Sequence, residues 1–465
     1  MSDIPQLEAA EARHQRLTAL DRAHVWHPFT QMSTWLEPLP GDEPVIIDHA
    51  RGSWLFDTRG RKYLDAISSL WVNVHGHHRT EIDSAIRLQL EHVAHSTLLG
   101  LANPPSIELA AELIRLSPKA PDEPGLNKVF YSDSGSTSVE IAVKMAFQHW
   151  RLRGKPKKQK FVALAEAYHG DTIGSVSVGG MDLFHEIFQP LLFDCLRVPT
   201  PYVYRWPTGP KHCLQAAALA AETLIHGRRD EIAAVIIEPL VQGAAGMITH
   251  PKGYLKRIAK ACKDNGVLLI CDEVATGFGR TGTLFACEQE EVVPDFLCVA
   301  KGLTGGYLPL AATLTTDAIY ESFLGPFESK KTFFHGHSYT GNSLACAAAI
   351  ASLKLFEENG TLAHVNAMAD RLAHGLMPLI DHPNVGDIRQ RGLMVGIELV
   401  KDRKTKEEFP YEARMGHKVA LAGRKRELML RPLGNVVVLM PPLSIAPAEI
   451  DFLAEQVRES ITEAI

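Results

Sequence analysis

The fold is decided by the stretch Val267-Leu268-Leu269-Ile270-Cys271-Asp272-Glu273-Val274, in which a continuous apolar run ends in two carboxylates. Such a run is typical of a strand that is buried on both faces in a parallel sheet. A second apolar run, 296–300, ends directly in Lys301, although lysine is rarely buried. The carboxyl ends of parallel strands meet at one edge of the sheet, where open α/β sheets bind ligands. We therefore expect Asp272 and Lys301 to lie at one site.

These two residues predict pyridoxal phosphate as the cofactor. A desolvated lysine is nucleophilic enough to form an imine with a carbonyl group, and a nearby carboxylate can hold a heterocyclic cation. Asp272 and Val274 are two residues apart, so their side chains point the same way on an extended strand. Asp272 could then pair with the ring nitrogen while Val274 packs beneath the ring.

Three further segments are candidates for the same site. The stretch 132–140, Ser-Asp-Ser-Gly-Ser-Thr-Ser-Val-Glu, follows an apolar strand and opens a helix. Backbone N–H groups at such a helix start can hold a phosphate, and a simple N-cap is the alternative. Tyr168 follows the apolar run 161–164 and could either stack on a planar ring or cap the core. Glu238 ends the run 234–237 and is either another site carboxylate or an ordinary loop acid.

The order of the segments predicts an α/β fold with a mostly parallel sheet. Helical stretches separate the apolar strands, which is typical of βαβ units; these strands are 129–131, 161–164, 234–237, 267–271 and 296–300. The segment 45–65 predicts an antiparallel hairpin outside that sheet, with a turn at Arg59-Gly60. Helical spacing covers 81–116, where two prolines start a new helix at Ser106.

Three parts of the chain are expected. Residues 1–65 form an N-terminal arm and hairpin, 66–354 form the large cofactor-binding domain, and 355–465 form a smaller α+β domain that the hairpin joins. Helical spacing and apolar runs in the last part predict helices at 362–379 and 412–427 and strands at 392–399 and 436–440.

Composition and charge exclude several classes of protein. The 465 residues are 46% hydrophobic and 22% charged, as in ordinary globular proteins. A net charge of −6 gives no basic surface for nucleic acid. The seven cysteines have no Cys-x-x-Cys spacing, which favours a reducing cytoplasm. No apolar run approaches the ~20 residues of a membrane span. We expect a soluble, cytoplasmic protein that binds neither nucleic acid nor membrane.

Two motifs are set aside, and one stays open. The groups His75-Gly76-His77-His78 and His335-Gly336-His337 lie in loops without the spacing of a metal site, so no metal is expected. The glycine-rich loop 277–282 does not follow the first strand of the sheet, which makes nucleotide binding improbable. The segment 26–32, Trp-His-Pro-Phe-Thr-Gln-Met, could pack on the core or line a substrate pocket.

From about Trp26 to the C-terminus, the chain resembles the class III, fold-type I aminotransferases that use pyridoxal phosphate. The most specific segment is 269–282, Leu-Ile-Cys-Asp-Glu-Val-Ala-Thr-Gly-Phe-Gly-Arg-Thr-Gly, followed by Lys301. The chain is also similar to the 7,8-diaminopelargonate synthase branch, which aminates 8-amino-7-oxononanoate in biotin synthesis, in the segments 26–30, 132–140, 168–172, 236–243 and 431–434. The resemblance implies a seven-stranded sheet flanked by helices and a ping-pong reaction. Another ω-amino acid transaminase of this class is the alternative.

The resemblance also implies roles for single residues. Lys301 becomes the Schiff-base lysine and proton shuttle, Asp272 keeps the ring nitrogen protonated, and Tyr168 joins them as the third catalytic residue. Cofactor contacts are implied for Ser134, Gly135, Ser136, Tyr168, Glu238, Val274 and, across the interface of a homodimer with shared active sites, Ser338. Substrate contacts are implied for Phe29, Leu70, Trp71, Gly336, His337 and Arg431. The forked guanidinium of Arg431 suits the oxononanoate carboxylate.

The amino donor is either S-adenosylmethionine or L-lysine. Members of the branch that use S-adenosylmethionine commonly have a tyrosine where Phe29 stands, a tryptophan where Leu70 stands, and Pro-Thr in place of His337-Ser338. The residues present here look more like the variants proposed to take L-lysine. These positions therefore favour lysine.

Overall fold

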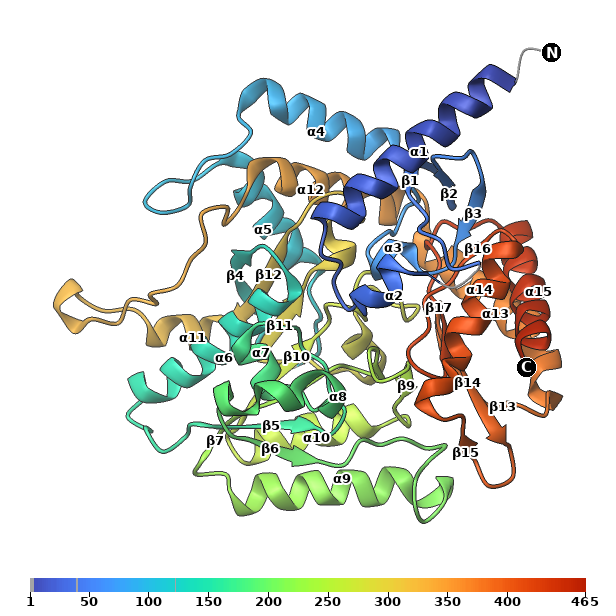
Figure 1. Ribbon diagram of the computed structural model, residues 1–465. Coiled ribbons are helices and arrows are strands. Elements are labelled where there is room, and N and C mark those ends of the chain that lie inside the picture. The colour runs from blue at the N-terminus through green and yellow to red at the C-terminus, as the bar shows by residue number, and fades with distance from the viewer. Residues whose placement is uncertain (1–3, 39–40, 122) are drawn as a thin grey trace.

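The computed structural model of the chain describes residues 4–38, 41–121 and 123–465. Its centre is a seven-stranded sheet with the strand order β4-β12-β11-β10-β7-β5-β6 (Figure 1). These strands are β4 (Leu126–Ser132), β5 (Lys160–Leu164), β6 (Cys195–Val198), β7 (Ile232–Ile237), β10 (Leu268–Asp272), β11 (Phe296–Val299) and β12 (Ala311–Thr316). Strands β11, β10, β7, β5 and β6 pair in parallel, while β12 runs antiparallel to both of its neighbours. The predicted α/β fold with a mostly parallel sheet is confirmed.

The central strands are buried on both faces, which explains their uninterrupted apolar runs. On one face, Phe161, Ile236 and Ile270 share a hydrophobic cluster with residues of α6 (Gly135–Leu152). On the other face, the alternate residues join a core that includes α9 (Pro210–Gly227) and α10 (Tyr254–Asp264). Successive side chains of a strand point to opposite faces, so one apolar run supplies both cores.

Segments from the two ends of the chain share a second sheet. β1 (Ile47–Arg51), β2 (Trp54–Asp57) and β3 (Lys62–Asp65) are antiparallel, as the hairpin prediction requires, and β16 (Leu428–Met429) pairs in parallel with β3. A third sheet contains β13 (Val385–Arg391), β14 (Met394–Asp402), β15 (Glu407–Glu408) and β17 (Val436–Leu439). The helices α13 (Thr361–Leu376), α14 (Met415–Lys425) and α15 (Pro447–Ala464) lie beside these sheets (Figure 1).

The remaining elements surround the large sheet. The helices are α1 (Ile4–His24), α2 (Met32–Leu36), α3 (Ser68–Trp71), α4 (Thr80–His92), α5 (Pro104–Leu116), α7 (Ile173–Val178), α8 (Asp182–His185), α11 (Asp317–Ser322) and α12 (Ser343–Glu358). A small hairpin pairs β8 (Val241–Gln242) with β9 (Ile248–Thr249). The segment between α11 and α12 extends away from the body of the molecule (Figure 1).

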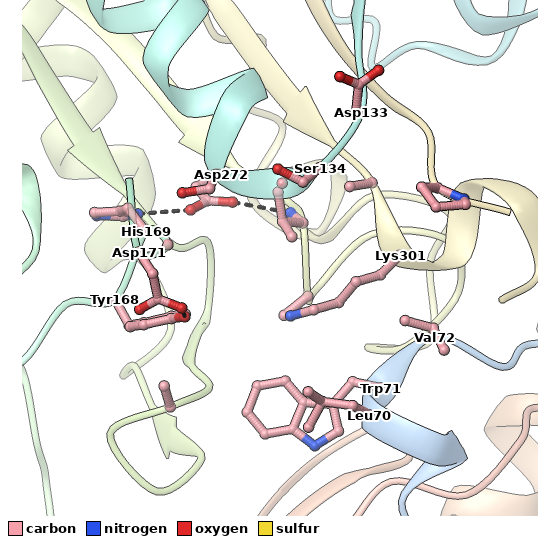
Figure 2. Close-up of a pocket in the computed structure, with 18 of the residues that line it drawn as sticks. Leu70, Trp71, Val72, Asp133, Ser134, Tyr168, His169, Asp171, Asp272 and Lys301 are labelled. Atoms are coloured by element: carbon pink, nitrogen blue, oxygen red, sulfur yellow. Dashed lines mark hydrogen bonds and ion pairs between the residues drawn. The ribbon is translucent and has the colours of Figure 1, made fainter. Parts of the chain in front are cut away.

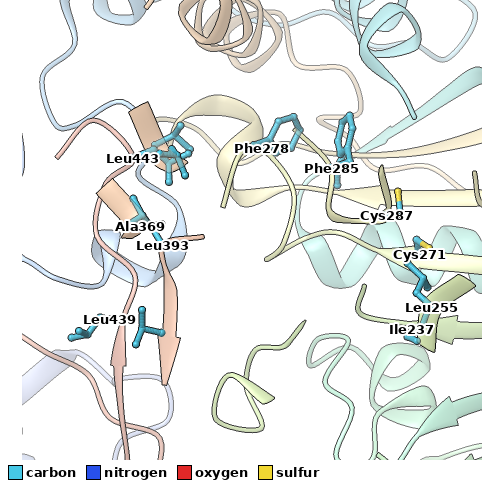
Figure 3. Packing of buried hydrophobic residues seen from close by; sticks show 14 of the residues in the cluster. Ile237, Leu255, Cys271, Phe278, Phe285, Cys287, Ala369, Leu393, Leu439 and Leu443 are labelled. Atoms are coloured by element: carbon cyan, nitrogen blue, oxygen red, sulfur yellow. The ribbon is translucent and has the colours of Figure 1, made fainter. Parts of the chain in front are cut away.

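One hydrophobic core connects the large sheet to the C-terminal part. Phe278 and Phe285, whose ring centroids are 5.6 Å apart, lie between the sheet and Leu443 (Figure 3). Gly279 follows Phe278 in the chain, has a φ angle of 84° and packs against Leu443. A Cβ atom there would come within 2.8 Å of Leu443 Cδ1, so both the backbone angle and the packing require glycine. The glycine-rich loop after β10 is thus a packing element.

Two local predictions differ from the structure, and one of the alternatives left open for residues 26–32 is narrowed. Helix α5 begins at Pro104 and not at Ser106, because Asn103 caps it by accepting the Ser106 N–H at 3.0 Å. Strand β10 ends at Asp272, so Val274 lies in a turn and the premise of an extended strand is wrong. Trp26 is 86% exposed, which excludes core packing of its side chain.

The proposed division into three parts stays a prediction. Its boundary between residues 354 and 355 falls inside helix α12. Residues 1–3 of the predicted N-terminal arm lie outside the described residues, and residues Ile4–His24 of that arm form helix α1.

Candidate active site

The residues predicted at the sheet edge lie around one cavity of about 730 Å³. Its walls come from the carboxyl ends of β10 and β11, the start of α6, the loop after β5 and the turn of α3. Figure 2 shows Lys301 and Trp71 facing each other across this space. Twelve of the residues predicted for the site line the cavity, namely Phe29, Leu70, Trp71, Ser134, Gly135, Ser136, Tyr168, Glu238, Asp272, Val274, Lys301 and Arg431.

Lys301 follows β11 and begins a short 3-10 turn with φ 42°, so the chain bends sharply where the strand ends. Its Nζ lies 4.7 Å from the centroid of the Trp71 ring, which is a cation–π distance. The side chain keeps partial exposure, yet it lies deep in the molecule. Desolvation therefore lowers the pKa of Lys301 to about 8, although the carboxylates of Asp272 and Glu238 oppose this shift.

Asp272 is held by two hydrogen bonds at the end of β10. Its Oδ2 lies 2.7 Å from His169 Nδ1, and its Oδ1 accepts the Val274 N–H at 3.0 Å. Both side chains are buried, and His169 Nε2 has no hydrogen-bond partner among the described residues. His169 is the site residue that the sequence does not identify, because its only signal is a position next to Tyr168. The pair presents a carboxylate that can hold a cation.

Glu238 links two backbone segments beneath the cavity. Its Oε1 accepts the Tyr168 N–H at 3.1 Å, and its Oε2 accepts the Gly243 N–H at 2.9 Å. Burial raises the pKa of Glu238 to about 7. Glu238 is therefore more than an ordinary loop acid, since it fixes the loop that carries Tyr168. The hydroxyl of Tyr168 donates to Asp171 Oδ2 at 2.8 Å.

The start of α6 forms another wall. The Ser134 side chain caps this helix by accepting the Thr137 N–H at 3.3 Å, and Ser136 Oγ accepts the Thr172 N–H at 3.0 Å. Both hydroxyl groups are thus used locally. The first N–H groups of a helix have no acceptor within the helix, so the backbone at Gly135 and Ser136 is available to an anion. The N-cap is thus observed, and it leaves the phosphate role of this helix start possible as a prediction.

Arg431 adds a positive charge to the cavity wall. It is half-buried, and burial lowers its pKa from the ordinary arginine value. None of the described carboxylates lies within salt-bridge distance of its guanidinium. A guanidinium in this position has the geometry to pair with a carboxylate or a phosphate.

Gly336, His337 and Ser338 lie outside the cavity, in the segment between α11 and α12. His337 Nδ1 lies 2.7 Å from Asp133 Oδ2, and Asp133 lines the cavity. The carbonyl oxygen of Ser338 lies 2.7 Å from His95 Nε2. The expected contact of the Ser338 hydroxyl with a partner subunit stays a prediction.

The two histidine groups make bonds within the protein. His75 Nε2 lies 2.9 Å from the Ser352 carbonyl oxygen, and His77 Nε2 lies 2.9 Å from Asp65 Oδ2. Among the described residues, no three His, Cys, Asp or Glu side chains converge as metal ligands do. No helix in that part of the chain is long and apolar enough to cross a membrane.

The chain is similar to known aminotransferases in sequence and in structure. The family model for class-III aminotransferases matches residues 39–461. The chain is 56% identical to the adenosylmethionine-8-amino-7-oxononanoate aminotransferase of Nitratidesulfovibrio vulgaris, over 97% of this chain and 82% of that protein. It superimposes with a TM-score of 0.91 on the crystal structure of the protein of that name from Methanocaldococcus jannaschii, at 46% identity over 97% of this chain and 99% of that one. The omega transaminase of Pseudomonas jessenii in complex with PMP gives the same TM-score at 31% identity, over 96% and 98% of the two chains.

Proposed function

Since the chain belongs to the class-III aminotransferase family, we propose that it aminates 8-amino-7-oxononanoate to 7,8-diaminononanoate in biotin synthesis. The family makes it a transaminase that depends on pyridoxal phosphate. One observation carries the substrate proposal: a desolvated lysine and an arginine without an anionic partner line the same cavity. A substrate for this arrangement has a carbonyl group at one position and a carboxylate at another. The printed name of the relative that is 56% identical supports the same acceptor.

The residues of the cavity fit pyridoxal phosphate. Lys301 would bind the cofactor aldehyde, and the buried carboxylate of Asp272 would pair with the protonated ring nitrogen. The backbone N–H groups of Gly135 and Ser136 would bind the phosphate at the positive end of an 18-residue helix. Such a cofactor requires free N–H donors for its phosphate and a carboxyl group for its ring nitrogen, and the start of α6 and Asp272 provide them. Tyr168 would lie against the ring.

Pyridoxal phosphate, when bound, supplies a cationic ring that stabilises the negative charge formed on the substrate carbon. The chain's own contribution is to move the proton. With a pKa of about 8, Lys301 exchanges a proton readily near neutral pH, and its Nζ can take the proton from one carbon and return it to another. General acid–base catalysis of this kind contributes roughly 10²- to 10⁴-fold. The two hydrogen bonds of Asp272 fix the orientation of its carboxyl group toward the ring.

The acceptor would bind with its carboxylate on Arg431. A guanidinium offers two parallel N–H groups to a carboxylate. The exposed apolar side chains Phe29 and Leu70 line the same cavity and suit the hydrocarbon chain between the carboxylate and the ketone. Burial of each methylene group there contributes about 0.8 kcal/mol.

S-adenosylmethionine and L-lysine are both proposed as donors, on different grounds. The names of the relatives support S-adenosylmethionine. Phe29 and Leu70, which differ from the residues common in enzymes that use S-adenosylmethionine, support L-lysine, and both line the cavity. We also propose a homodimer in which Ser338 reaches the phosphate of the partner subunit, since the segment that carries Ser338 extends away from its own body (Figure 1).

The test is the absorbance spectrum of the purified enzyme with bound pyridoxal phosphate. One donor at a time is added, and oxononanoate follows. A donor that bleaches the visible band identifies itself, and recovery of the band with oxononanoate identifies the acceptor. Lys301→Ala should lose both the band and turnover; an active Lys301→Ala enzyme contradicts the assignment.

The second candidate is another ω-amino acid transaminase, which the likeness to the Pseudomonas jessenii enzyme favours. Ornithine and 4-aminobutyrate are therefore added as donors in the same assay. If either bleaches the band while oxononanoate does not restore it, the biotin-pathway proposal is wrong and this second candidate is correct.

A further inference from the structure

The side chain that faces Lys301 is carried by a strained turn. Ser68, Ser69 and Trp71 have φ angles of 51°, 62° and 64°. Positive φ angles are uncommon and unfavourable for residues other than glycine. Such a conformation persists only where the surrounding structure holds it, so the groups that bind this turn determine where Trp71 lies.

One buried carboxylate binds the turn. Asp65 ends β3 and has no exposed surface. Its two oxygens accept the Ser69 N–H at 2.9 and 2.8 Å, and Oδ1 also accepts the Ile67 N–H at 3.4 Å. The side-chain partner of Asp65 is His77, whose Nε2 lies 2.9 Å from Oδ2. The backbone of His77 is itself fixed by two hydrogen bonds to Gly52, at 3.0 and 2.8 Å.

Other contacts hold the turn at Ser68 and pack against two sides of the Trp71 ring. The Ser68 hydroxyl donates to the Met440 carbonyl at 2.7 Å. A Cβ atom on Gly243 would come within 3.3 Å of Trp71 Cζ3, so the ring packs closely against that backbone. The remaining side of the ring faces Lys301 Nζ at 4.7 Å (Figure 2).

We propose that Asp65 and His77 are positioning residues that hold Trp71 against Lys301. The inference rests on the proposed role of Lys301 in binding the cofactor. With asparagine at position 65, the Ser69 N–H keeps one acceptor oxygen in place of two, and the turn relaxes toward negative φ. Trp71 then withdraws and water reaches Lys301, and this hydration stabilises the ammonium by more than the lost cation–π contact destabilises it.

The experiment compares Asp65→Asn with Asp57→Asn. Asp57 is a matched control, because it is a buried aspartate of the same sheet. It also holds a turn, since it accepts the Arg59 and Arg61 backbone N–H groups at 2.9 Å. Unlike the turn at Trp71, Asp57 does not line the cavity. The rate at which the cofactor-free protein attaches added pyridoxal phosphate is measured by visible absorbance. We expect Asp65→Asn to slow attachment about tenfold, because water that reaches Lys301 favours its unreactive ammonium form, while Asp57→Asn leaves the rate unchanged.

A double-mutant cycle with Trp71→Leu tests whether Asp65 acts through the indole. If it does, the double mutant Asp65→Asn/Trp71→Leu attaches the cofactor no more slowly than Trp71→Leu alone. If the two effects multiply to about a hundredfold, Asp65 acts by another route and the proposal is wrong. A lower thermal midpoint in Asp65→Asn with an unchanged rate shows a purely structural role and also overturns it.

His77 provides a second test in case Asp65→Asn fails to fold. His77→Leu removes the donor to Asp65 and should slow attachment, whereas the glutamine in His77→Gln keeps an N–H donor and should restore most of the rate. Equal rates in the two variants reject the role of His77. Cofactor attachment requires neither donor nor acceptor, so a wrong substrate assignment leaves these results valid. A visible band that persists in Lys301→Ala would instead show that the lysine assignment has failed.

Discussion

Lys301 should attach pyridoxal phosphate with a pH dependence centred near 8 and not near the ordinary lysine value. Desolvation lowers the pKa of Lys301 from 10.5 to about 8, and only the neutral amine is nucleophilic. At pH 7, about one Lys301 amine in ten is neutral, against about one in three thousand for a lysine with ordinary pKa. Attachment at this pH should therefore be about 300-fold faster than an unperturbed lysine allows.

The perturbation that tests this reasoning is Glu238→Gln. Glu238 raises the pKa of Lys301 against the effect of desolvation, and its own pKa of about 7 makes it an anion at higher pH. Loss of that charge disfavours the lysine ammonium. The midpoint of the rate profile should move to lower pH, and a midpoint at about pH 7 would raise the rate at that pH about fivefold.

The assay mixes cofactor-free protein with pyridoxal phosphate in a stopped-flow instrument from about pH 6 to about pH 11, a range that spans both pKa values. Glu288→Gln is the matched control, since Glu288 is a partly buried carboxyl group with a raised pKa that does not line the cavity. A wild-type midpoint near the ordinary lysine pKa would refute the reasoning. An identical midpoint in wild type and Glu238→Gln would show that Glu238 does not act on Lys301.

Three other predictions follow from the site. Arg431→Leu should raise the KM for oxononanoate about a hundredfold or more, because two charge-assisted hydrogen bonds are lost. Arg431→Lys should raise the KM by less. Equal KM values in wild type and the leucine variant reject the assignment. His169→Ala removes the 2.7 Å contact to Asp272 and should raise the Kd for pyridoxal phosphate about tenfold or more, as spectroscopic titration would measure. Gly135→Ala brings a Cβ within 2.9 Å of Val274 Cγ2 and closer to Cγ1. It should reduce the free energy of unfolding by about 1–3 kcal/mol, and Val274→Ala should restore part of it; denaturant unfolding without any such rescue argues against this clash.

The parts of the fold that sequence predicts are the parts with a strong apolar signal. β10 and β11 are buried on both faces, so they lack the polar residues that would obscure a strand. β12 is missed because it contains three threonines, two of which are satisfied by hydrogen bonds to backbone carbonyls, Thr313 to Ser138 at 2.8 Å and Thr315 to Asp295 at 2.9 Å. Burial of such residues becomes evident only once their partners are in place.

Sequence predicts the residues of the site under the same condition, namely that each has a strong local signal. Asp272 and Lys301 are predictable because each directly ends an apolar strand. His169 is not, since its contact with Asp272 spans 103 residues of sequence. Arg431 comes from the resemblance to a family, because an arginine before a strand has no feature that distinguishes it from a surface residue. Val274 lies at the cavity as predicted, although the turn that places it there is not the extended strand from which its position was argued.

The hydrogen bond that joins the turn after β3 to the C-terminal part of the chain has a consequence for synthesis of the protein. The Ser68 hydroxyl binds the carbonyl of Met440, which is added to the chain 372 residues later. At roughly 5 to 20 residues per second, a ribosome needs roughly 20 to 75 s to make that segment. Throughout this time the turn that carries Trp71 lacks one of its anchors, and contacts so distant in sequence form slowly. The nascent chain therefore cannot complete this turn until Met440 has been synthesised.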